Sequence, residues 1–304
     1  MVRRESTWFA GVVANVIAVP VSESAVLAIS VESGRLSAGL VADSGTVLVR
    51  DRVTTPARDV WRGLDRLIGR VLAAAPVGVE VADIATVSVV GPIDADAGTV
   101  SPPHVPSWDG FTLREHVESA TGRRVLIDSA GAAAAEYERW LGEARGVSSY
   151  AAIVADAVVD SAVVLGGIRV SGAFGNAGSV AHINVDPGGR PCWCGASGCL
   201  DPYLSSIAIE AEIGRSIRQA TPSVIERSGI MLGRAIATLA AMADVDRFYV
   251  SGGVVDVFGD QMLDVCRNEI RLRSKMGYLA GLQVIEPVEH SSSIVASAAL
   301  ALAR

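Results

Sequence analysis

The sequence has few charged residues and no concentration of basic ones. Only 19% of the 304 residues are Asp, Glu, Lys or Arg, and acids outnumber bases by 33 to 26, which gives a net charge of −7. The lack of a basic block argues against broad affinity for nucleic acid or anionic membranes. Hydrophobic residues make up 50% of the chain, so we expect a compact globule without long disordered tails.

Cysteine and histidine are also scarce, with four of each in the chain. So few cysteines make a poor disulfide framework for a chain of this length, which indicates a reducing compartment and a cytoplasmic location. Three of the four cysteines nevertheless lie in one short segment, AHINVDPGGRPCWCGASGCLD. The fourth, Cys266, is expected to be a free thiol in a helix.

Residues 1–24 do not have the pattern of a membrane span. Their apolar run is interrupted by Asn15 and Pro20 and is too short to cross a bilayer. One interpretation is a secretory signal, with Ser22 and Ser24 at cleavage-like spacing. The other, which we adopt, is an N-terminal arm that forms an extra strand or packs on the body of the protein.

Strand and helix patterns alternate from residue 25 onward. Three strand patterns joined by short turns cover residues 25–54, and apolar residues at helical spacing predict a helix within 57–76. Further strands and helices alternate through residues 83–145, and the second half repeats this order loosely. The sequence therefore predicts an α/β protein in which helices flank mixed sheets, and it suggests an internal duplication.

The cysteine-rich segment supplies ligands suited to zinc. Cys192 and Cys194 are one residue apart, Cys199 follows after four residues, and nine residues separate His182 from Cys192. A Cys₃His set with no open position is typical of a structural, tetrahedral zinc site. The alternative is three small buried cysteines and a core histidine.

The same segment resembles the signature of the ROK family, which includes bacterial repressors and sugar kinases. That signature reads Gly-Glu-x-Gly-His, nine residues, then Cys-x-Cys-Gly-x-x-Gly-Cys-x-Glu, and the resemblance extends along nearly the whole chain from Ala25. It implies a two-domain, actin-like (ribonuclease H-like) ATPase and sugar-kinase fold with a structural zinc loop and a dimeric or tetrameric assembly. The expected domains are residues 25–130 plus 288–304 and residues 131–287, with 1–24 as the arm.

The resemblance also indicates that both phosphate loops are altered. The family's Asp-x-Gly-Gly-Thr is matched by residues 30–34, SVESG, where Glu32 brings a carboxylate. Its Gly-Thr-Gly-x-Gly-x-Gly is matched by residues 156–162, DAVVDSA, which lacks glycine and contains two aspartates. Phosphate groups need backbone amide groups at these positions, so we expect neither ATP nor Mg²⁺. Gly252 and Gly253, in the turn that abuts adenosine in the kinases, are the remnants of the nucleotide site.

The resemblance places Ala130 at the family's catalytic Asp, and alanine cannot accept a proton. We therefore assign no catalytic residue. Asp128 is a weak substitute that would need a two-residue bulge, and its alternative role is an exposed or capping acid. The ligand-binding candidates that the resemblance implies are His104, Ser129, Ser179, His182 and Asp201. His104 and Asp201 could hydrogen-bond a polyol, although residues at such positions are more often simply cleft-rim or loop residues.

Three functions follow as hypotheses. The first is a non-catalytic regulatory or interaction protein, the second a sensor that binds a sugar-like molecule without turnover, and the third an active ATP-dependent hexose kinase. We expect a homo-oligomer, most simply a dimer. We expect no DNA binding, because ROK repressors carry a helix-turn-helix of roughly eighty residues ahead of this body, whereas 24 residues precede Ala25.

Overall fold

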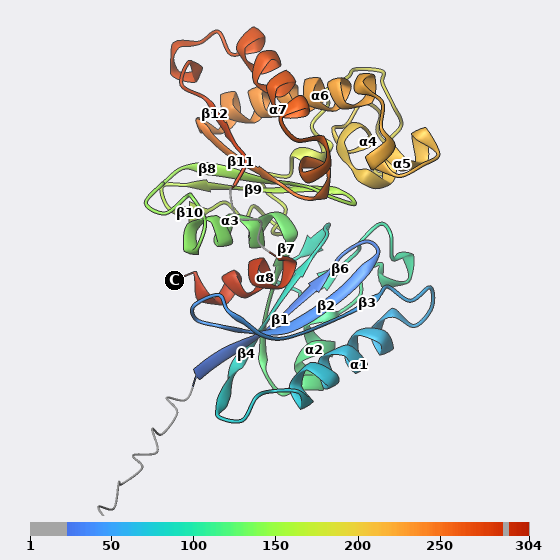
Figure 1. The fold of residues 1–304 in the computed structure, drawn as a ribbon, viewed down its shortest axis with the longest axis vertical. Coiled ribbons are helices and arrows are strands. Elements are labelled where there is room, and N and C mark those ends of the chain that lie inside the picture. The colour runs from blue at the N-terminus through green and yellow to red at the C-terminus, as the bar shows by residue number, and fades with distance from the viewer. Residues whose placement is uncertain (1–22, 288–291, 304) are drawn as a thin grey trace, which may run out of the picture.

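The computed structural model describes residues 23–287 and 292–303, and most of the expected arm, residues 1–24, lies outside them. Two five-stranded mixed sheets form the centres of two lobes, one above the other in Figure 1. None of the helices in the described part of the chain is both long enough and apolar enough to cross a membrane.

The first lobe is built around a sheet with strand order β3-β2-β1-β4-β7. β1 pairs in parallel with β4, which pairs in parallel with β7, whereas β1, β2 and β3 form an antiparallel meander. Helices α1 and α2 cover the face of this sheet away from the second lobe (Figure 1). The elements are β1 (Glu23–Val31), β2 (Arg35–Ala42), β3 (Val47–Thr54), α1 (Val60–Ala73), β4 (Val79–Val89), β5 (Ile93–Asp94), β6 (Thr99–Val100), the 3-10 helix η1 (Pro106–Trp108), α2 (Leu113–Thr121) and β7 (Arg124–Ser129).

The second lobe repeats the same strand directions in the order β10-β9-β8-β11-β12. This correspondence between the sheets supports the internal duplication suggested by the sequence. The elements are α3 (Ala130–Trp140), β8 (Tyr150–Ala155), β9 (Val159–Leu165), β10 (Ile168–Arg169), η2 (Val180–His182), α4 (Asp201–Leu204), α5 (Ser206–Ile213), η3 (Ile217–Gln219), α6 (Pro222–Ala243), β11 (Arg247–Ser251), α7 (Gly253–Arg273), η4 (Gly277–Leu279) and β12 (Gln283–Ile285).

Two alanine-rich helices, α3 and α8 (Ser293–Leu302), lie side by side between the sheets (Figure 1). α8 packs on β1 and β4 although it follows the second lobe in sequence. Small side chains allow this close approach, and Ala133, Ala298 and Ala299 are almost completely buried in one cluster. The Ser297 hydroxyl donates to the Ile29 carbonyl at 2.7 Å, which fixes α8 on the first sheet.

The predicted helix within 57–76 is confirmed. α1 places Leu64, Leu67 and Val71 in the core, and its first turn is capped by Asp59, whose side chain accepts from the Arg62 amide. Cys266 lies in α7, fully buried and without a disulfide. Burial raises the pKa of its thiol to about 12, so it is an unreactive core residue.

Candidate ligand cleft and metal site

A cavity of about 860 Å³ lies where the two lobes meet. It is bounded by the end of β1, by β2 and β3, by the first turns of α3, α7 and α8, and by the β8–β9 connection. This is large enough for a small molecule. The polar side chains that line it are Ser30, Glu32, Ser33, Arg35, Ser37, Arg50, Arg52, Thr54, Ser88, Asp156, Asp160, Ser251, Asp256, Ser292 and Ser293.

The turn between β1 and β2 is closed by an ion pair. Arg35 donates to Glu32 through Nη2 at 2.7 Å and through Nε at 3.1 Å. The Ser30 hydroxyl donates to the same carboxylate at 3.3 Å. Glu32 is therefore held on the cavity wall by contacts within its own turn.

The β11–α7 turn keeps both predicted glycines, and Asp156 lies against it. Gly252 has φ +108, and a Cβ there would lie 2.5 Å from the Ala155 carbonyl oxygen, so only glycine fits. At Gly253 a Cβ would lie 3.2 Å from Oδ1 of Asp156. Burial, and then the nearby Glu32 carboxylate, raise the pKa of Asp156. A carboxylate thus stands beside the first turn of α7, where the positive end of the helix dipole stabilises negative charge.

A second carboxylate, that of Asp160 on β9, lies against the first turn of α3. Oδ2 of Asp160 accepts the Gly131 amide at 3.0 Å, and Oδ1 accepts the Ser161 amide at 2.8 Å. Burial raises the pKa of Asp160 to about 6, although these amide groups oppose the rise. The Ala132 amide donates to the Ser129 hydroxyl at 3.0 Å. The Gly131 and Ala132 amide groups at the start of α3, beside Ala130, are therefore already hydrogen-bonded to side chains of this protein.

Asp128 is not an exposed or capping acid, so that alternative in the sequence analysis was wrong. Its side chain is buried and forms an ion pair with Arg169, and the cap of α3 is Ser129. Burial raises the pKa of Asp128, whereas Arg169 lowers it. The strand end at β7 remains in regular register with β4 through Ser129. Asp128 therefore serves to join β7 to β10.

None of the five ligand-binding candidates lines the cavity in the part of the chain that the structure describes. His104 Nδ1 lies 3.2 Å from the Ser33 hydroxyl. Asp201, which is buried, accepts the Val159 amide at 2.9 Å. Ser179 precedes the short helix η2, which ends at His182. The structure brings His182 close to Asp201. Burial lowers the pKa of His182, and the charge of Asp201 opposes this effect.

The predicted zinc ligands are clustered. The nitrogen and sulfur atoms of His182, Cys192, Cys194 and Cys199 lie within 4.8 Å of one another. Nδ1 of His182 is 3.7 Å from Sγ of Cys192, and the sulfur atoms of Cys194 and Cys199 are also 3.7 Å apart. In a tetrahedral site, a Zn–S bond of about 2.3 Å requires a spacing of about 3.8 Å between sulfur atoms. The four side chains therefore fit a zinc ion, which would need little rearrangement of the loop.

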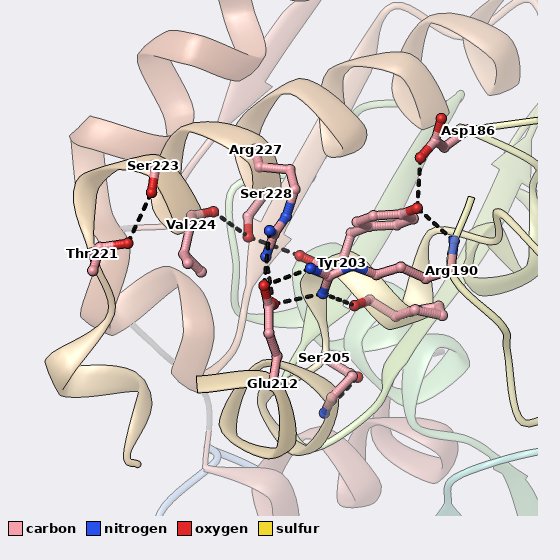
Figure 2. Close-up of polar contacts among 12 residues, drawn as sticks. Asp186, Arg190, Tyr203, Ser205, Glu212, Thr221, Ser223, Val224, Arg227 and Ser228 are labelled. Carbon is pink, nitrogen blue, oxygen red and sulfur yellow. Dashed lines mark hydrogen bonds and ion pairs between the residues drawn. The ribbon is translucent and has the colours of Figure 1, made fainter. Parts of the chain in front are cut away.

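A polar network fixes the loop that carries these ligands (Figure 2). The Tyr203 hydroxyl donates to Asp186 at 2.6 Å and accepts the Arg190 amide at 2.8 Å. Glu212 on α5 forms ion pairs with both Arg190 and Arg227. Hydrogen bonds from Arg190, and then from Arg227, lower the pKa of Glu212 to about 2 against the effect of burial. This network ties the cysteine-rich loop to α5 and α6.

The sequence analysis missed the arginines on the cavity wall. Arg50 and Arg52 lie on β3, and both side chains line the cavity beside Arg35. A signal was present, because alternating polar residues in the strand segment RDRVT place Arg50 and Arg52 on one face.

Comparison with known proteins gives the same assignment by a separate route. The model of the ROK family matches residues 26–303. The chain is 25% identical over 245 residues to N-acetylmannosamine kinase of Haemophilus influenzae, covering 75% of this chain and 80% of that protein. It is 26% identical over 281 residues to glucokinase of Streptomyces coelicolor, covering 81% and 87%.

Solved structures share the fold. A ROK-family transcriptional regulator, homologous to the MLC protein of E. coli, matches with a TM-score of 0.80 at 23% identity, covering 92% of this chain and 78% of that one. A ROK glucokinase from Streptomyces griseus, in complex with glucose and AMPPNP, matches with a TM-score of 0.77 at 24% identity, covering 90% and 98%. With its two mixed sheets and its sugar-kinase-like α/β fold, the chain belongs to the ROK family.

Proposed function

We propose that this protein is a ROK-family member that does not transfer phosphate and that acts in regulation or interaction. The observation that carries the proposal is the carboxylate of Asp160, which accepts the Gly131 amide at the start of α3. Asp156 lies beside Gly253 at the start of α7. In a kinase, backbone amide groups at helix starts bind the phosphates of the nucleotide.

The loss of a base adds to the loss of phosphate contacts. Ala130 has no group that could take a proton from a sugar hydroxyl, and absence of a general base typically costs a factor of about 10² to 10⁴ in rate. Glu32, Asp156 and Asp160 line the same cavity and repel the charged γ-phosphoryl group. Positioning and charge stabilisation are therefore lost together with the base.

The sensor hypothesis is favoured by a different observation, the size of the cavity. Side-chain replacements in the loops have not filled the cleft, and about 860 Å³ remains between the lobes. A ligand that contacts both lobes would stabilise the arrangement of the lobes to which it binds, without any reaction. In this proposal the two lobes are the predicted domains, residues 25–130 plus 288–304 and residues 131–287.

The remaining properties of the proposal follow the family. The zinc ion is structural, held by His182, Cys192, Cys194 and Cys199, and it stabilises the loop without taking part in chemistry. The protein acts in the cytoplasm as a homodimer, and no ATP or Mg²⁺ is required.

The test is a coupled ADP-release assay with Mg-ATP and glucose, mannose, N-acetylglucosamine or N-acetylmannosamine. Streptomyces coelicolor glucokinase is the positive control, and a tag-matched preparation from cells without the gene is the background. We expect no activity above background, and none in Ala130→Asp, because the new carboxylate would stand beside that of Asp160. Turnover by the unmodified protein, or activation by Ala130→Asp alone, would establish the hexose-kinase hypothesis instead.

A further inference from the structure

One wall of the cavity carries a row of polar side chains in register across four strands. Arg52 on β3 is opposite Ser37 on β2, Ser37 is opposite Ser30 on β1, and Ser30 is opposite Ser88 on β4. Residues directly opposite each other in neighbouring strands project from the same face. All four line the cavity, so this face of the first sheet presents one guanidinium and three hydroxyl groups to it.

Arg50 extends the row of positive charge. It lies two residues from Arg52 and therefore on the same face of β3. Opposite Arg50 is Gly39, which has no side chain to restrict it. Both guanidinium groups are exposed, and neither has an ion-pair partner within residues 23–287 and 292–303. Arg35, in contrast, is paired with Glu32.

Two of the serines have hydroxyl groups without a hydrogen-bond partner among the described residues. Ser37 is 5% exposed and Ser88 is 3% exposed, and neither hydroxyl has a hydrogen bond to any residue that the structure describes. Neither oxygen is among the buried side-chain atoms that lack a partner, so both hydroxyl groups are open to the cavity. Because both side chains line the cavity, a ligand there can supply the missing hydrogen bonds.

The opposite wall has the reverse charge. Asp156 lines the cavity from the β8–β9 connection, Asp160 from β9 and Asp256 from α7. Carboxylates on such a wall accept hydrogen bonds from hydroxyl groups but repel anions. An anionic group is therefore accepted only on the side of Arg50 and Arg52, where planar guanidinium groups bind phosphate or carboxylate through paired hydrogen bonds.

We propose that the cavity binds a small polyhydroxylated anion, with its charged group on Arg50 and Arg52 and its hydroxyl groups on Ser37, Ser88 and the facing carboxylates. Sugar phosphates and sugar acids both have this chemistry. The inference rests on the proposed non-phosphorylating function, since it assigns the ligand that a sensor would detect. It places the anion on the sheet of the first lobe, away from the starts of α3 and α7.

Isothermal titration calorimetry on the full chain tests this with glucose 6-phosphate, gluconate, glucose and inorganic phosphate. We expect glucose 6-phosphate or gluconate to bind, and the one that binds identifies phosphate or carboxylate as the charged group. Glucose should not bind measurably, and inorganic phosphate should bind more weakly than the charged sugar. Phosphate that binds as tightly as glucose 6-phosphate would overturn the role of the hydroxyl contacts, and failure of both charged sugars would overturn the proposal.

Variants locate the site. Arg50→Ala and Arg52→Ala should each weaken binding roughly tenfold or more, because each removes a charge-assisted hydrogen bond. Arg52→Lys, which keeps the charge, should lose less. Arg66→Ala is the matched control, since Arg66 is exposed on α1, on the far side of the sheet (Figure 1). Equal affinities of Arg52→Ala and Arg66→Ala for the charged sugar would overturn the assignment. Thermal melts of both variants verify that they are folded.

The two proposals fail in different ways. Calorimetry without nucleotide reports anion binding whether or not the protein is a kinase. ADP release in the coupled assay would contradict the proposed function and leave the binding result intact. An absence of both turnover and anion binding would contradict only the inference about the ligand.

Discussion

Replacement of Asp160 by Asn should change how stability depends on pH. Burial raises the pKa of Asp160 from 3.8 to about 6, so the folded protein holds this proton more tightly than the unfolded chain does. The corresponding stabilisation is complete below pH 3.8 and is lost as pH rises through 6. It amounts to about 3 kcal/mol in all, of which about 1.4 kcal/mol is lost between pH 5 and 7.5.

Urea unfolding of wild type and Asp160→Asn at pH 5 and 7.5 measures this change. Other titrating groups cancel in the difference between the two proteins, so the stability of wild type relative to the variant should fall by about 1.4 kcal/mol as pH rises. Asn also accepts only one of the amide groups of Gly131 and Ser161, but that loss is nearly the same at both pH values. Asp65→Asn removes an exposed carboxylate from α1 and is the control. A pH-independent difference for Asp160→Asn would mean that its carboxylate does not lie buried at the start of α3.

Three further predictions concern packing, metal and assembly. Gly131→Ala would place a Cβ 2.4 Å from the Ser161 backbone and should lower the free energy of unfolding by about 1–3 kcal/mol. Gly69→Ala on α1, whose Cβ would have nothing within 4 Å, is the control and should raise the free energy of unfolding by about 0.5–1 kcal/mol. Equal effects of the two substitutions in urea unfolding would contradict the α3–β9 contact. Elemental analysis should find one zinc per chain in wild type and in Cys266→Ala but none in Cys199→Ser, and a wild type free of zinc would refute the site. Light scattering at micromolar concentration should give twice the chain mass of 31.5 kDa, and a monomer would count against the dimer.

The fold could be predicted largely because its elements are marked by strong local signals. The β1–β3 meander combines apolar strands with a tight turn, and α1 has a wide apolar face ended by Pro76. α2 ends where Gly122 adopts φ +66, a backbone conformation that favours glycine. The pairing of α3 with α8 could not be predicted, because it joins segments more than 150 residues apart through small side chains that resemble any helix interior.

The candidate site was predicted unevenly for a similar reason. The Cys₃His cluster depends on spacing within a single loop, so residue order determined it. The absence of glycine from residues 156–162 is plain in the sequence itself. The bond from Gly131 to Asp160 joins two lobe elements 29 residues apart, and the row from Arg52 to Ser88 depends on strand register. Neither follows from sequence spacing alone, and both change what the cleft can bind.

The charges of the cleft differ from those of a phosphate site in a consistent way. A nucleotide site concentrates free amide groups and positive helix ends on one wall. Here that wall carries Asp156 and Asp160, and removal of Asp160 would leave the Gly131 amide without its side-chain partner as well as restoring space. Positive charge lies instead on β3, at Arg50 and Arg52. A return to nucleotide binding would therefore require removal of both carboxylates, because glycine at 156 alone would leave Asp160 bonded to the Gly131 amide.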